Sequence, residues 1–182
     1  MKNIILIAII ILTFFISCRK STLKITEPGP SFFLDKMKGG DYTNGDGNDS
    51  FKVSDDGKNI TIGSGSNTTN NYTFESDIMG IGGIYQDTNS SNYIGVFPFG
   101  DSMHTVTMSK DEKDALNEIV QAVGGENSAA VIQAILTNDK KLDADSITKN
   151  FPDKKNEVEN IIKKHKLDEK NKFGDYKEYK KT

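Results

Sequence analysis

The chain has a single cysteine, Cys18, and its surroundings predict the chemistry of its thiol. Lys2 provides a positive start, and residues 4–16 are apolar apart from Thr13. Ser17 then places a small residue directly before the cysteine. This arrangement is typical of a bacterial lipoprotein signal, in which the thiol is acylated and becomes the new N-terminus. The alternative interpretation is an uncleaved signal-anchor with an incidental cysteine.

The length of the apolar run fits the first interpretation. Residues 4–16 are too few to cross a bilayer core, which takes about 20 apolar residues. An acyl chain adds about 0.8 kcal/mol of membrane affinity per buried methylene, and several chains make a lasting anchor. With Cys18 acylated, no thiol remains for a disulfide, a zinc–thiolate site or cysteine catalysis. We therefore expect a signal peptide over 1–17, a lipid anchor and no cofactor.

Oxygen-bearing side chains alternate with glycine in residues 44–49, as at the start of a calcium-binding loop. Asp49, however, stands where such a loop requires glycine, and Asp55 stands twelfth in place of a bidentate Glu. No helical pattern precedes the segment. The segment is better explained as a turn-rich polar loop, and we predict no metal site.

A second motif, Gly-Ile-Gly-Gly at residues 80–83, suggests a phosphate-binding loop. It lacks both the helix that should follow such a loop and the Lys-Ser/Thr pair that completes it. Glycines that allow close backbone approach within a strand are the favoured explanation.

The chain has two histidines, His104 and His165, which excludes a histidine-rich metal cluster. His165 continues the helical spacing of Val158 and Ile162 and is expected at the edge of a core. Ser102 and His104 could belong to a hydrolytic triad, but these strand positions do not bring the two side chains face to face. No nucleophile-elbow pattern surrounds them. We expect the protein not to be an enzyme.

Four aromatic residues gather in the predicted strands: Tyr85, Tyr93, Phe97 and Phe99. Large aromatic side chains most often fill a core, and this is the favoured interpretation. A ligand platform built on the same rings is the alternative.

Charge is distributed unevenly along the chain. Residues 19–148 carry 11 basic and 19 acidic side chains, whereas residues 149–182 carry 11 lysines and 7 acids. A basic end on an acidic body can bind an anionic partner, whereas a solvated lysine-rich helix and tail is the simpler interpretation. We expect no nucleic-acid partner. The candidate anion-binding residues are Lys163, Lys164, Lys166, Lys170 and Lys172.

These residues are positioned by two successive kinds of pattern. After a flexible tether over 18–50, alternating apolar and polar residues predict an antiparallel β region over 51–108. A helical region follows over 109–167, opened by a capping box at Ser109 and Glu112. Residues 168–182 are expected to be a charged, mobile tail. Strands followed by helices predict an α+β fold with a small antiparallel sheet. The predicted strands are 51–53, 60–62, 72–75, 81–86, 93–97 and 103–108, and the predicted helices are 109–123, 128–137, 145–149 and 152–166.

The N-terminus also resembles a known group of proteins. The leader Met1-Lys2-Asn3-Ile4, the box Phe15-Ile16-Ser17-Cys18 and the Lys/Asn/Asp-rich body are similar to surface lipoproteins of the Lyme-disease group of spirochaetes. Lipoproteins of Bacteroidetes have similar leaders. The resemblance implies a palmitate-bearing outer-membrane protein, often facing outside, with a role in host contact or immune evasion. It carries over one functional residue, Cys18.

From these observations we expect a lipid-anchored outer-membrane lipoprotein that is exposed on the cell surface. Its expected role is non-enzymatic binding of a host or envelope macromolecule. The alternative is a periplasm-facing structural or assembly lipoprotein that contacts an envelope partner.

Overall fold

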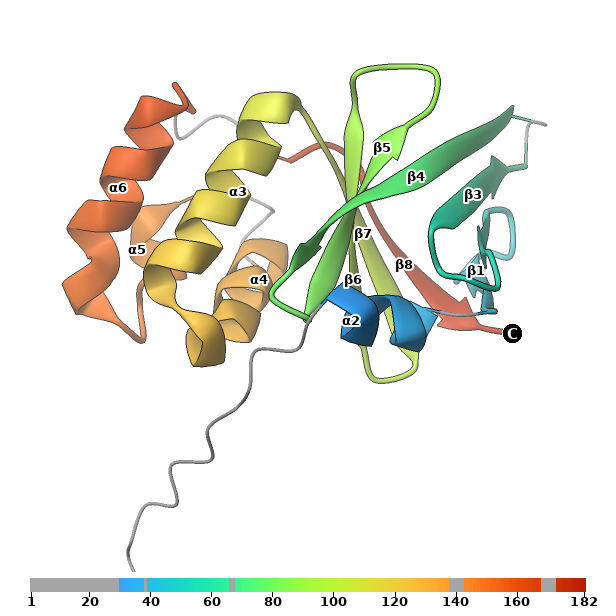
Figure 1. The fold of residues 1–182 in the computed structure, drawn as a ribbon, viewed down its shortest axis with the longest axis horizontal. Coiled ribbons are helices and arrows are strands. Elements are labelled where there is room, and N and C mark those ends of the chain that lie inside the picture. The colour runs from blue at the N-terminus through green and yellow to red at the C-terminus, as the bar shows by residue number, and fades with distance from the viewer. Residues whose placement is uncertain (1–29, 38, 66–67, 138–142, 168–172) are drawn as a thin grey trace, which may run out of the picture.

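The fold is a closed barrel of eight antiparallel strands that pair in chain order, with β8 pairing back onto β1 (Figure 1). The computed structural model describes residues 30–37, 39–65, 68–137, 143–167 and 173–182. The predicted signal peptide and Cys18 lie outside these residues. The predicted α+β fold is wrong, because the sheet closes on itself and the helices form an insertion between β7 and β8.

The strands are β1 (Asp41–Asn44), β2 (Ser50–Val53), β3 (Asn59–Ser64), β4 (Thr68–Ile78), β5 (Gly82–Asp87), β6 (Tyr93–Phe99), β7 (Ser102–Met108) and β8 (Tyr176–Lys181). The helices are α2 (Pro30–Met37), α3 (Lys110–Val123), α4 (Ser128–Thr137), α5 (Ala144–Ile147) and α6 (Lys155–Lys164). Two 3-10 turns, Gly125–Asn127 and Pro152–Lys154, precede α4 and α6. The six predicted strands and four predicted helices all have counterparts here.

Three elements occupy ranges in which we expected flexible chain. Helix α2 and strand β1 lie within the expected tether over 18–50, and β8 lies within the expected tail over 168–182. Both strands are polar, and each contributes one large buried side chain to the interior, Tyr42 from β1 and Tyr179 from β8. These two polar strands pair with each other. A prediction that omits both of them therefore gives an open sheet.

The barrel interior is filled with side chains, which is the usual content of a small eight-stranded barrel. Aromatic rings meet across it: the centroids of Phe51 on β2 and Tyr179 on β8 are 5.3 Å apart, and those of Tyr42 and Phe51 are 5.8 Å apart. The Tyr85 hydroxyl, also inside, donates to the carbonyl of Gly57 at 2.8 Å. The other large interior residues are Ile60, Ile62, Tyr72, Ile94, Val96 and Met103.

Helix α2 packs against one end of the barrel. It begins at Pro30, as proline is favoured in a first helical turn, and it buries Phe33 and Met37 completely. Two glycines make room for it. A Cβ at Gly83 would lie 2.3 Å from the Phe33 ring, and one at Gly57 would lie 2.8 Å from the Leu34 carbonyl oxygen. The helix is therefore fitted to the barrel and contributes to its core.

The helices α3–α6 form a second core against the outside of the barrel wall. Strand alternation supplies both cores: on β6, Ile94 and Val96 face the interior, whereas Tyr93 and Phe97 pack with the helices. Gly82 confirms the predicted close approach, because a Cβ there would lie 2.4 Å from the Phe97 ring. Core filling is thus confirmed for these outer aromatics and for Tyr85.

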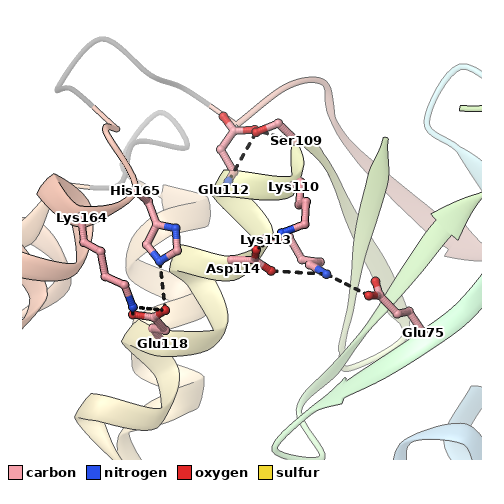
Figure 2. Close-up of polar contacts among 9 residues, drawn as sticks. All are labelled: Glu75, Ser109, Lys110, Glu112, Lys113, Asp114, Glu118, Lys164 and His165. Carbon is pink, nitrogen blue, oxygen red and sulfur yellow. Dashed lines mark hydrogen bonds and ion pairs between the residues drawn. The ribbon is translucent and has the colours of Figure 1, made fainter. Parts of the chain in front are cut away.

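The start of α3 is confirmed in atomic detail. The Ser109 N–H donates to the Glu112 carboxylate at 2.6 Å, and the Glu112 N–H donates to the Ser109 hydroxyl at 3.4 Å (Figure 2). This capping box begins the helix immediately after β7, and Gly124 ends it. The helical insertion is therefore held close to the barrel wall from its first turn.

The fit between α2 and Gly83 generates a stability prediction. Gly83→Ala should destabilise the protein by about 1–3 kcal/mol, because the new methyl group collides with the Phe33 ring. The matched control is Gly45→Ala, where a Cβ would meet nothing within 4 Å, and it should stay within about 0.5 kcal/mol of the parent.

A double-mutant cycle measured by urea unfolding checks the cause. Phe33→Ala alone should cost about 3–5 kcal/mol. Gly83→Ala should then cost at least about 1 kcal/mol less in the Phe33→Ala background than in the parent, because the ring is gone. Simple additivity would show that α2 does not pack on Gly83.

Candidate functional site

Two grooves of the described structure could bind a ligand, and the first is lined by one of the predicted lysines, Lys164. A groove of about 480 Å³ runs between α3 and α6, and we call it the α3–α6 groove. Lys164 lies on its wall, Lys163 is its exposed neighbour on α6, and Lys166 follows the helix with a positive φ of 55°. Lys170 and Lys172 lie outside the described residues. The lining residues are Glu118, Gln121, Ala122, Glu157, Asn160, Ile161 and Lys164.

Ion pairing offsets the positive charge of this groove. The Lys164 ammonium donates to both carboxylate oxygens of Glu118, at 2.7 and 2.9 Å, and the His165 Nε2 lies 3.1 Å from the same carboxylate (Figure 2). These hydrogen bonds hold the pKa of Glu118 below its ordinary value. Lys163 lies 3.8 Å from Glu159. The lysine anion site stays a prediction, weakened by these carboxylates.

A second polar cluster joins α3 to the barrel. Lys113, with its side chain 10% exposed, donates to Glu75 on β4 at 2.8 Å and lies 4.5 Å from the centre of the Tyr93 ring. A β-bulge between Phe74 and Ser76 interrupts the alternation of β4 at Glu75. Burial lowers the pKa of Lys113, but its hydrogen bond to Glu75 and the neighbouring carboxylates outweigh burial and raise it. Figure 2 shows that the pair links strand to helix, which is a structural role.

The end of the barrel opposite α2 carries a polar pair that the sequence did not reveal. The Lys177 ammonium on β8 donates to Asp49, in the turn before β2, at 2.5 Å, and Asp49 is 7% exposed. This hydrogen bond, helped by one from Ser64, holds the pKa of Asp49 below its ordinary value. The Asn44 side chain accepts from the Asp49 N–H at 3.1 Å. The suspected calcium loop is thus a turn whose last carboxylate pairs with a lysine.

Metal and triad chemistry can be examined on the described residues. Among them, no group of three His, Cys, Asp or Glu side chains is placed to hold a metal ion. Ser102 donates to Glu178 at 3.0 Å, whereas the Nδ1 of His104 lies 2.6 Å from the Tyr176 hydroxyl. The two side chains therefore bond to different partners on β8. Burial lowers the pKa of His104.

The second groove, of about 420 Å³, lies on the outer wall, and we call it the β4–β5 groove. Its lining combines hydroxyl, amide and carboxylate groups with Phe74, whose ring packs against Phe33 and Tyr85. No short sequence motif marks it, because its residues meet through the pairing of β4 with β5. The lining residues are Thr73, Phe74, Glu75, Gln86, Asp87, Thr88 and Ser90.

Comparison with known proteins adds no assignment. No family model matches the chain, and no curated protein or solved structure is significantly similar to it. Within the described part of the chain, no helix has the length and apolar character needed to cross a membrane. Any functional argument therefore depends on the residues themselves.

The arrangement as a whole suits hydrogen bonding to a polar partner. Both grooves are open to solvent and are lined by amide and carboxylate groups, to which the β4–β5 groove adds hydroxyl groups. These groups recognise ligands through directional hydrogen bonds. The Asp49–Lys177 pair, in contrast, links β8 to the turn between β1 and β2 and stabilises the closed barrel.

The Asp49–Lys177 pair generates a pH prediction. Because folding lowers the pKa of Asp49, its contribution is present above the ordinary carboxyl pKa of 3.8 and is lost as the pH falls through the folded value. Asp49→Asn should therefore cost about 1–3 kcal/mol at neutral pH. The difference from the parent should shrink as the pH falls towards about 2.

Thermal unfolding of both proteins across this pH range checks the expectation. Asp46→Asn, which alters an exposed carboxylate in the same turn, is the matched control and should follow the parent throughout. A constant gap between Asp49→Asn and the parent at all pH values would contradict an ionic origin.

Proposed function

We propose that this chain is a bacterial lipoprotein, anchored in the outer membrane through acylated Cys18, exposed on the cell surface, and binding a host macromolecule without catalysis. The observation that carries the proposal is the position of Cys18 directly after a short apolar run and a small residue. The resemblance of the leader to those of spirochaetal surface lipoproteins supports the same cellular location.

The fold is compatible with this attachment. Eleven residues, 19–29, lie between Cys18 and Pro30, the first residue of α2. A chain of this length spans at most about 40 Å when extended, so a lipid at Cys18 would keep the α2 end of the barrel near the membrane. The opposite end, with the Asp49–Lys177 pair, and the outer wall would then be accessible to large partners.

The outer surface supports a binding role. The α3–α6 groove presents hydrogen-bonding side chains from two helices, and the β4–β5 groove presents them from two strands and from the turn that follows β5. Strands and helices hold such groups more accurately than loops do. Two open polar grooves on a tethered domain suit recognition of an extended partner.

Protease treatment of intact cells tests the proposed location on the cell surface. We expect external protease to remove the protein while a periplasmic marker survives. A Cys18→Ala variant, which cannot be acylated, should leave the membrane fraction and lose its metabolic labelling with palmitate.

Either of two results would contradict the proposal. Survival of the protein beside the surviving marker would place it inside and favour the periplasmic, structural alternative. Unchanged membrane attachment of the Cys18→Ala variant would show that the N-terminus acts as an uncleaved anchor.

A further inference from the structure

We propose that the β4–β5 groove is the binding site for a neutral oligosaccharide. The inference rests on the proposed function, because it names the ligand class and the surface through which the lipoprotein would bind. It depends on three observations: the position of the groove, the chemistry of its lining and its charge.

The groove lies on a wall that the helices border only at Glu75, which accepts from Lys113 on α3. In Figure 1, α3–α6 occupy one side of the barrel, and β3 and β4 extend on the other. Thr73 on β4 and Gln86 on β5 are directly paired across the two strands, and both side chains are exposed. The backbone N–H of Thr88 continues this contact by donating to the Asn71 carbonyl at 2.9 Å. At Thr73 and Gln86 the groove floor is thus paired sheet.

A ladder of uncharged polar residues extends the lining across β3 and β4. The Thr61 hydroxyl donates to the Asn71 side-chain oxygen at 3.0 Å, and the Thr73 hydroxyl donates to that of Asn59 at 3.3 Å. These bonds fix the orientation of both amides and use their oxygens. In the described contacts the amide N–H groups of Asn59 and Asn71 remain available as donors. The ladder and the groove share Thr73, so an elongated ligand could contact both.

The two carboxylates in the lining are already oriented by contacts within the protein. Glu75 accepts from Lys113 at 2.8 Å. Asp87 accepts from the Asn89 N–H at 2.8 Å and from the Ser90 hydroxyl at 2.9 Å. An ionised carboxylate has about four lone-pair positions, so each keeps acceptor capacity towards a ligand hydroxyl. Their positions are set before any ligand arrives.

Charge and polarity select the ligand class. The described lining contains two acids and no Lys or Arg, so it disfavours anionic ligands such as nucleic acids and sulphated glycans. Its volume falls within the range of small-ligand sites, and six of its seven lining residues carry polar groups, which an apolar ligand would leave without hydrogen bonds. Neutral sugars carry hydroxyls that both donate and accept, as the amide and hydroxyl side chains here require.

The experiment uses full-length acylated protein in a detergent without a sugar headgroup. An array of neutral oligosaccharides identifies the best ligand, and calorimetry measures its affinity. Gln86→Ala and Thr88→Ala should each weaken binding at least tenfold, which corresponds to about 1.4 kcal/mol. Among the described contacts no hydrogen bond or ion pair uses either side chain, so both variants should melt like the parent.

Gln121→Ala is the matched control, because it removes an exposed glutamine from the α3–α6 groove instead. It should bind like the parent. The proposal would be overturned if no neutral oligosaccharide binds, if Gln121→Ala weakens binding and Gln86→Ala does not, or if heparin binds and Gln86→Ala abolishes it. None of these outcomes would alter protease accessibility on cells. The proposed binding site can therefore be wrong while the proposed surface location is correct.

Discussion

The pairing of β8 with both β7 and β1 is the constraint on which the rest of this structure depends. β8 follows four helices in the chain, yet it pairs between β1 and β7, which both precede those helices in the sequence. Tyr179 then fills the interior, and Lys177 reaches Asp49 beside the turn between β1 and β2. Without β8, strands β1 and β7 would be exposed edges with unpaired backbone groups.

Closure also explains why one wall of the barrel can support two cores. The side chains of β6 alternate between the interior and the helices, so the same strand stabilises both sides. Glycines lie where bulky rings need the room, as at Gly82 beside Phe97 and Gly83 beside Phe33. Lys113 adds a polar link from α3 to β4. The grooves therefore lie on a rigid frame, which is what a preformed binding surface requires.

Much of this frame could be predicted from local pattern. Alternation located the six central strands, and the Ser109–Glu112 capping box located α3, because both signals lie within a few residues. Barrel closure could not be predicted, because the sequence of β1 is typical of a polar loop and that of β8 is typical of a charged tail. Each needs a distant partner: Tyr179 is buried by Phe51, and Lys177 is neutralised by Asp49. The β4–β5 groove was missed for the same reason, because it is created by strand register.

Amide hydrogen exchange in the full-length protein tests the closed barrel most directly. We predict that the hydrogen-bonded amides of Tyr176–Lys181 exchange as slowly as those of Tyr93–Phe99, because both strands open only when the barrel unfolds. Rapid exchange of Tyr176–Lys181 beside a protected Tyr93–Phe99 would contradict closure. It would show an open sheet followed by a mobile tail.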